Sequence, residues 1–213
     1  MPFRDRADAG RFLAGKLKVY AHRTDVIVLG LPRGGVPVAA EVARALHAPL
    51  DVFLVRKLGV PGREELAMGA IASGGVRVVN TSVVDAFNIP ESLLAAKAAE
   101  EEAELARRER LYRDDRPPLK LAGRAVILVD DGLATGATMR AAIAATRISR
   151  PAVVVVAVPV AAPTIAAEIS ALADDFACVA TPDGFRAVGL WYLDFTPTTD
   201  DEVRKLLAQA NES

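Results

Sequence analysis

The chain has 213 residues, and its 26 Lys and Arg side chains against 27 Asp and Glu side chains give a formal net charge of −1. A charge this close to zero provides no general attraction to nucleic acid or to an anionic membrane, which excludes a general polyanion-binding protein. Hydrophobic residues make up 52% of the chain, so the disordered, collagen-like and low-complexity classes are excluded as well.

The first half of the chain contains a predicted βαβ unit. Residues 25–30 are rich in β-branched side chains and predict a buried strand. A Gly-rich turn and a helix over residues 36–46 follow, and residues 50–56 predict the second strand.

A long helix is predicted over residues 90–113, within an insert at about residues 90–115. Glu residues precede Arg residues along it, which suits the helix dipole, and Glu104 with Arg108 forms a favourable i,i+4 pair. We interpret these charges as a solvated helix face. A nucleic-acid patch is the alternative, but the neighbouring acids would cancel its field. The proline pair that begins at Pro117 ends the helix.

The second half repeats the alternation of strands and helices. Strands are predicted at residues 125–130, 152–160 and 175–181, and helices at residues 137–147 and 163–173. This pattern predicts an α/β fold with a doubly wound, mostly parallel sheet flanked by helices. The length predicts one domain over residues 1–213, with a core at about residues 20–180.

Neither a membrane span nor a metal cluster is expected. The longest nearly apolar run, residues 152–162, is interrupted by Pro159, whereas a spanning helix needs about 20 such residues. The N-terminus is polar and does not resemble a secretory signal, so we expect a cytoplasmic protein. The single cysteine, Cys178, forms no internal disulfide, and His22 and His47 lie too far apart in the sequence to suggest a zinc site.

Two adjacent carboxylates at the end of a predicted strand carry the chemistry. Asp130 and Asp131 lie at the carboxyl end of their strand, the edge where open α/β sheets bind ligands. Carboxylates suit ribose hydroxyls or a hydrated magnesium ion. In the next turn, Thr135, Gly136 and Thr138 offer N–H groups and hydroxyls to a phosphate at a helix N-terminus. The sequence therefore predicts a sugar-phosphate site.

Two common phosphate motifs do not match this turn. It lacks the Gly-Lys-Ser/Thr ending of a nucleotide-triphosphate loop, and residues 30–35 lack the Gly spacing of a dinucleotide fingerprint. Residues 126–138 resemble instead the phosphoribosyl-pyrophosphate (PRPP) signature of the type I phosphoribosyltransferases, which is an apolar strand, two acids and a small-Thr-Gly-x-Thr loop. An ordinary βα turn is the alternative.

The resemblance implies a reaction and a set of binding residues. It implies transfer of the 5-phosphoribosyl group from magnesium-bound PRPP to a nitrogen acceptor such as a nucleobase, with release of pyrophosphate. Asp130 and Asp131 would bind the ribose and the Mg²⁺, and the loop would bind the 5-phosphate. The loop residues are Ala134, Thr135, Gly136, Ala137 and Thr138.

The resemblance also implies a pyrophosphate loop after the first strand. Pro32, Arg33, Gly34 and Gly35 occupy that place. The glycines would let the backbone approach the ligand, and Arg33 would pair with pyrophosphate oxygens as a catalytic group. By resemblance, the Pro32–Arg33 peptide bond is expected to be cis. The alternative is a tight βα turn with a surface arginine.

A mobile lid over the reacting centre is a further implication of the resemblance. Residues 56–65 contain the glycine, proline and charged residues expected of such a loop. Lys57 is the candidate for a second pyrophosphate contact, and Glu64 or Glu65 is the candidate proton partner. An exposed loop with incidental charges is the alternative.

The C-terminal segment at about residues 181–200 is expected to form a hood over the nucleobase. Its sequence resembles the hood of the 6-oxopurine phosphoribosyltransferases, with a spacing two residues longer. Phe185 or Trp191 would stack on a flat ligand, and Asp194 would approach magnesium-bound pyrophosphate. The alternative assigns these aromatic side chains to the core.

One substitution leaves the acceptor open. The 6-oxopurine enzymes have an Asp just before the signature Thr-Gly, where this chain has Ala134, as in the adenine and uracil phosphoribosyltransferases. The enzyme hypothesis competes with a non-catalytic module of the same fold that senses PRPP or a nucleotide. Arg33 and Lys57 favour the enzyme, because a sensor of a monophosphate needs no pyrophosphate contacts. The resemblance further implies nucleotide metabolism and a homodimer.

Overall fold

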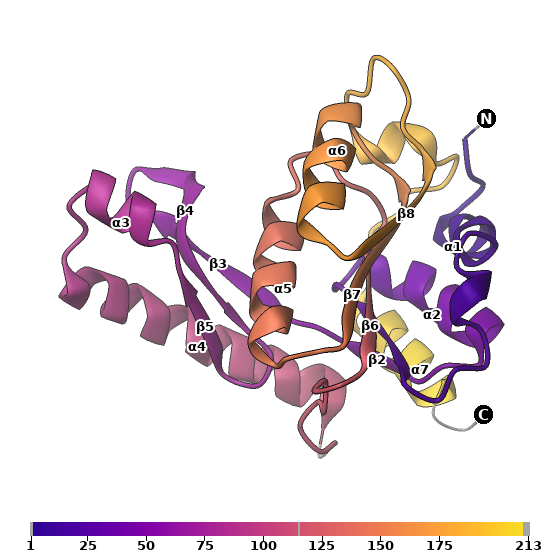
Figure 1. Ribbon diagram of the computed structural model, residues 1–213, viewed down its shortest axis with the longest axis horizontal. Helices are drawn as coiled ribbons and strands as arrows, with labels where there is room; N and C mark the ends of the chain where they lie inside the picture. The colour runs from indigo at the N-terminus through magenta and orange to yellow at the C-terminus, as the bar shows by residue number, and fades with distance from the viewer. Residues whose placement is uncertain (1, 115, 211–213) are drawn as a thin grey trace.

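A computed structural model describes residues 2–114 and 116–210 of the chain. Its central sheet has five parallel strands in the order β2-β1-β6-β7-β8 (Figure 1). The strands are β1 (Val26–Gly30), β2 (Leu50–Val52), β6 (Ala125–Val129), β7 (Val153–Val160) and β8 (Asp175–Ala180). The predicted α/β fold with a mostly parallel sheet is confirmed.

Helices cover both faces of this sheet. One face carries α1 (Arg6–Ala14), α2 (Gly35–Leu46) and α7 (Asp200–Gln209), and the other carries α5 (Ala137–Ile148) and α6 (Pro163–Leu172) (Figure 1). Successive side chains of a strand point to opposite faces. In β6, fully buried Ile127 packs on the α2 side and fully buried Leu128 on the α5 side. The strands are apolar throughout because both of their faces are buried.

A second, antiparallel sheet corrects the predicted lid. Residues 56–65 are not a loop: they lie in a hairpin of β3 (Val55–Val60) and β4 (Arg63–Ala72), and β5 (Val76–Val79) completes the sheet. Leu58 and Val60 are buried and pair with β4, which explains why a segment with glycine, proline and charges still forms a strand. The predicted strand at residues 50–56 is likewise divided, because β2 ends at Val52.

The predicted long helix is confirmed as α4 (Glu91–Arg113), which follows the short α3 (Thr81–Ala86) and runs beside the second sheet (Figure 1). The expected pair is present, with Arg108 Nε 2.7 Å from Glu104 Oε1. The helix is more than a solvated face, because Leu105 joins the main core and the buried Arg113 pairs with Asp51 at 3.1 Å.

Helices α1 and α7 have no counterpart among the elements predicted from the sequence, although both begin at a recognisable cap. The Asp5 carboxylate accepts a hydrogen bond from the N–H of Asp8, and the Thr199 hydroxyl accepts one from the N–H of Glu202. Short 3₁₀ turns are found at Lys18–Tyr20 and Val188–Trp191.

His22 and His47, which are distant in the sequence, meet in the fold. Their rings stack with centroids 4.5 Å apart at the end of the sheet opposite the carboxyl edge of β1. Within residues 2–114 and 116–210, apart from the side chains of Glu64 and Glu65, no three His, Cys, Asp or Glu side chains are grouped as metal ligands. In the same part of the chain, no helix combines the length and apolarity needed to cross a membrane.

Candidate functional site

The two carboxylates lie where the winding of the sheet reverses. Strands β1 and β6 are neighbours, yet the helices that follow them, α2 and α5, cover opposite faces. The loops after β1 and β6 therefore diverge at the carboxyl edge of the sheet, which is where α/β proteins bind ligands, and we call this edge the crevice. Asp130 and Asp131 directly follow β6 at this edge.

The loop after β1 packs against the two carboxylates without intervening side chains. A Cβ atom on Gly34 would collide with Oδ2 of Asp131, and one on Gly35 would lie 2.6 Å from the carbonyl oxygen of Val129. The N–H of Leu31 also donates to that carbonyl, at 2.8 Å. Only glycine permits this approach, so the structure brings the predicted pyrophosphate loop and the acidic pair together.

The peptide bond between Pro32 and Arg33 is cis, as the resemblance implied. The Arg33 side chain is about half exposed, and its Nη1 lies 3.9 Å from Oδ1 of Asp200 at the start of α7. The side chain that was predicted to contact pyrophosphate is therefore accessible at the crevice edge, with one distant carboxylate as neighbour.

Arg6, which the sequence did not single out, occupies the site beside Asp131. Its Nε donates to Asp131 Oδ2 at 2.8 Å, although the two residues are 125 positions apart. Its Nη1 donates to the carbonyl oxygen of Thr196 at 2.8 Å, and its guanidinium carbon lies 3.9 Å from the centre of the Phe195 ring. The acidic pair thus has a cation built into the same site.

Burial raises the pKa values of both members of the acidic pair. Burial raises the pKa of Asp130 well above its ordinary value, and the charge of Asp131 raises it further. Burial also raises the pKa of Asp131, while its hydrogen bond from Arg6 acts in the opposite direction. Carboxyl oxygens beside one guanidinium can accept hydrogen bonds from a polyol as well as bind a metal ion.

The turn after the acidic pair forms the open end of α5. Gly136 has a φ of 70° and precedes the first residue of the helix, Ala137. Thr135 and Thr138 are exposed on this turn, as is Ala134. The first N–H groups of a helix have no partner within it, so they and the two hydroxyls could bind a phosphate here.

The second sheet holds the remaining lid candidates. Lys57 lies on β3, opposite Ala70 of β4. The side chains of Glu64 and Glu65 lie outside the described part of the structure, so their predicted proton role stays a prediction.

The residues of the predicted hood pack together near the acidic pair. Phe185 and Trp191 are partly buried against a small apolar cluster that contains Phe3 and Tyr192. A Cβ on Gly132 would lie 2.6 Å from Val188, so the hood lies directly over the residue that follows the pair. The Tyr192 hydroxyl donates to the carbonyl oxygen of Asp131 at 2.6 Å.

Asp194 is placed differently from the other acids. It is exposed, and its Oδ1 accepts hydrogen bonds from the Thr196 hydroxyl at 2.6 Å and the Thr196 N–H at 2.9 Å, which lower its pKa. Among the described residues it forms no three-ligand group with Asp130 and Asp131.

The N-terminal segment is joined to the hood by the main chain. The N–H of Phe3 donates to the carbonyl oxygen of Trp191, and the N–H groups of Leu193 and Asp194 donate to the carbonyl oxygens of Phe3 and Arg4. This pairing places α1, and with it Arg6, at the site.

Residues 4–186 match the model of the family described as the phosphoribosyl transferase domain. The chain belongs to this family. Two Mycobacterium tuberculosis proteins, from strains CDC 1551 and H37Rv, each carry the name "Putative phosphoribosyl transferase" and are 48% identical to it over 209 residues. The match covers 98% of this chain and 47% of each relative, so the chain spans about half the length of those curated relatives.

Solved structures share the fold of this chain. The crystal structure of TT1426 from Thermus thermophilus has a TM-score of 0.90 and 44% identity, and covers 98% of this chain and 99% of that one. The AQ2163 protein of Aquifex aeolicus, at 12% identity and a TM-score of 0.51, covers 95% of this chain and 84% of its own, and shows the fold alone.

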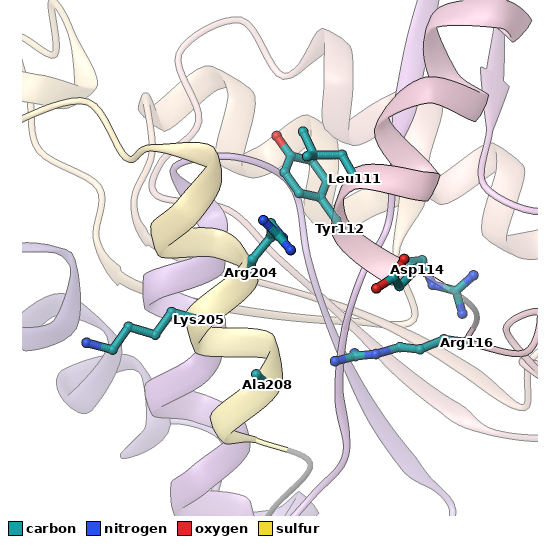
Figure 2. A pocket seen from close by; sticks show the side chains of 8 residues that line it. Leu111, Tyr112, Asp114, Arg116, Arg204, Lys205 and Ala208 are labelled. Atoms are coloured by element: carbon teal, nitrogen blue, oxygen red, sulfur yellow. The ribbon is translucent and has the colours of Figure 1, made fainter.

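A cavity in this phosphoribosyl transferase domain lies away from the acidic pair. It has a volume of about 610 Å³ and separates the end of α4 from α7 (Figure 2). Arg116 extends across it to donate to the carbonyl oxygen of Leu207, at 3.0 Å, while Lys205 points away (Figure 2). Its lining residues are Leu111, Tyr112, Arg113, Asp114, Arg116, Arg204, Lys205 and Ala208.

Proposed function

We propose that the protein transfers the 5-phosphoribosyl group of PRPP to a nitrogen acceptor and releases pyrophosphate. The observation that carries this proposal is the contact between two loops at the crevice: Gly34 lies against the carboxylate of Asp131, so one ligand can touch both loops. Membership of the phosphoribosyl transferase domain family supports the same chemistry.

The proposed reaction is a displacement at C1 of the ribose. A nitrogen lone pair forms the new bond to C1, the bond from C1 to the pyrophosphate oxygen breaks, and pyrophosphate leaves with the electrons of the broken bond. The acceptor nitrogen gives up its proton, for which Glu64 or Glu65 is our candidate partner. The chain supplies positioning and electrostatic stabilisation rather than covalent chemistry. Asp130 and Asp131 would hold the ribose near the developing cation, and the turn at Thr135 would anchor the 5-phosphate.

We assign the binding of the pyrophosphate leaving group to the loop after β1 and to β3. Arg33 would pair with pyrophosphate oxygens, and Lys57 would provide a second cation. Both charges would stabilise the pyrophosphate as it separates from C1. Phe185 and Trp191 remain our candidates for contact with the acceptor.

The acidic pair fits a magnesium ion that arrives with the substrate. Mg²⁺ usually binds one or two carboxylates together with substrate phosphates and water. Asp130 and Asp131 provide such a pair of oxygen ligands, and we propose Asp194 as a contact to magnesium-bound pyrophosphate. When bound, the ion would neutralise charge on the pyrophosphate.

The test is a screen of nucleobases and simple amines with PRPP and magnesium, in which released pyrophosphate is measured. Release that depends on one acceptor class would support the enzyme. PRPP binding without release for any acceptor would support the sensing module instead. Failure of both PRPP and ribose 5-phosphate to bind at millimolar concentration would overturn the proposed site.

Three broader expectations belong to the same proposal. We propose one folding unit, a homodimer and a cytoplasmic location in nucleotide metabolism; a single cysteine is typical of a reducing compartment. A single cooperative unfolding transition and light scattering after size-exclusion chromatography would test the first two. Fractionation of cells would test the third.

A further inference from the structure

Arg6 is the charged group at the site that the proposed reaction does not use. Its side chain is 11% exposed, against 15% for Asp131, so both partners are largely removed from water. A buried guanidinium is stable only where its charge and its N–H groups are matched. The role of Arg6 therefore lies in its effect on the Asp131 carboxylate.

Three contacts from different directions hold the Arg6 guanidinium in one orientation. Its Nε donates to Asp131, its Nη1 donates to the carbonyl oxygen of Thr196, and its flat face lies on the Phe195 ring. The planar arrangement of its N–H groups makes such a position rigid. A rigid donor fixes the acceptor to which it is bonded.

The fixed acceptor is one particular oxygen of Asp131. Oδ2 receives the hydrogen bond from Arg6 and is the atom that a Cβ on Gly34 would meet. The main chain of the same residue is held as well, by the hydroxyl of Tyr192. With Oδ2 occupied on the protein side, Oδ1 is the oxygen left for a ligand.

We infer that Arg6 is a positioning residue for ribose recognition, which holds Oδ2 of Asp131 so that Oδ1 accepts a hydrogen bond from a ring hydroxyl of the pentose. This inference rests on the proposed function. Arg6 acts through Asp131 and does not touch the substrate. Without it, no donor fixes the orientation of the carboxylate, and Asp131 loses its preference for a ligand that carries the hydroxyls, because a carboxylate is selective only when its acceptor geometry is fixed.

The experiment compares three ligands by calorimetry: ribose 5-phosphate, 2,3-dideoxyribose 5-phosphate and pyrophosphate. The variants are Arg6→Met and Arg6→Lys, with Arg11→Met as the matched control, because Arg11 lies on the same helix and pairs with Asp8 and Glu41, away from the acidic pair. Arg6→Met is expected to bind ribose 5-phosphate about tenfold more weakly, the loss typical of a charge-assisted hydrogen bond.

The same variant should bind the dideoxy compound and pyrophosphate within about twofold of the wild type, because neither ligand carries the 2- and 3-hydroxyls that Asp131 would accept. Arg6→Lys should fall between Arg6→Met and the wild type, because it keeps the charge without the planar donor pair. Arg11→Met should match the wild type for all three ligands. A merely structural role of Arg6 would weaken all three ligands together.

Two results would overturn the inference while leaving the proposed function intact. One is an Arg6→Met protein that keeps the wild-type preference for ribose 5-phosphate over the dideoxy compound. The other is tighter binding of ribose 5-phosphate by that variant, which would make Arg6 a competitor for the carboxylate. A wild-type protein that does not distinguish the two sugars would instead remove the pentose role of Asp131, and the proposed function with it.

A second variant covers the case in which Arg6→Met does not fold. Phe195→Leu removes the ring face under the guanidinium and keeps Arg6 and Asp131 in place. We expect the same selective loss for ribose 5-phosphate, smaller than that of Arg6→Met. An unchanged preference in a folded Phe195→Leu protein, together with an unchanged preference in Arg6→Lys, would count against the inference.

Discussion

Arg33 and Asp200 approach each other across the edge of the crevice, with Nη1 of the arginine 3.9 Å from Oδ1 of the carboxylate. The same Oδ1 accepts a hydrogen bond from the hydroxyl of Tyr112, so Asp200 is held in place by α4. A carboxylate at this position competes with an anionic ligand for Arg33.

Asp200→Asn should therefore tighten pyrophosphate binding. Both side chains are about half exposed, so the expected gain is only about twofold. Calorimetry with pyrophosphate measures it, and Asp201→Asn is the matched control because Asp201 is the next residue of α7 and is almost fully exposed. Weaker binding by Asp200→Asn would show that the carboxylate supports Arg33 rather than competes with it.

Asp131→Asn should lower the rate of pyrophosphate release by at least about tenfold, since it removes a charge from the ribose contact and half of the pair with Arg6. The fold should persist, which circular dichroism would check. Turnover close to that of the wild type would contradict the role of Asp131. Asp201→Asn, at an almost fully exposed carboxylate of α7, is the control and should keep the wild-type rate.

Gly34→Ala should reduce both stability and ligand binding. The φ of Gly34 is −62°, which alanine adopts freely, so the cost comes from the collision of the new methyl group with Asp131. We expect a loss of about 1–3 kcal/mol in the free energy of unfolding, measured with urea. Gly15→Ala is the control: its φ is −59° and its nearest new contact is 3.2 Å away, so a comparable loss there would contradict the explanation.

All three tyrosines should ionise well above their ordinary range. Burial, followed by the hydrogen bond to a carboxylate, raises the pKa of Tyr20 and of Tyr112 to about 12, and burial raises the pKa of Tyr192 further. The protonated form is favoured in the folded protein, so this contribution to stability is complete below pH 10 and is lost as the pH rises through about 12.

Absorbance near 295 nm during an alkaline titration measures this ionisation. The expected trace has no step centred at pH 10 while the protein is folded. Tyr20→Phe should remove part of the step near pH 12, because its partner Asp175 is independent of Asp200. A step of one tyrosine at pH 10 in the folded protein would contradict the burial of these side chains.

The central sheet could be predicted because its information is local. Each strand is a short run of β-branched and aliphatic residues, and each is followed by a turn and a helix of suitable period. The hairpin of β3 and β4 is harder to predict from the sequence, because Gly59, Pro61 and Gly62 are typical of loops. Its strand character comes from pairing with β4, which no local pattern of residues 56–65 reveals.

The site residues also differ in whether local sequence is enough to predict them. The PRPP signature and the loop at Arg33 are contiguous motifs, and the structure brings them together as the βα topology requires. Arg6 could not be found in this way, because its partner lies 125 residues away. The cap formed by Asp5 and Asp8 is a local signal from which α1 can be predicted, but it does not predict the contact of Arg6 with Asp131.

The main-chain hydrogen bonds of Phe3 and Arg4 to the hood make residues 3–6 part of the site. Deletion of residues 2–6 would leave the parallel sheet whole, yet it would remove the cation from Asp131 and the hydrogen bonds that join this segment to the 3₁₀ turn at Val188–Trp191. Loss of this segment should therefore affect ligand occupancy more than it affects global unfolding.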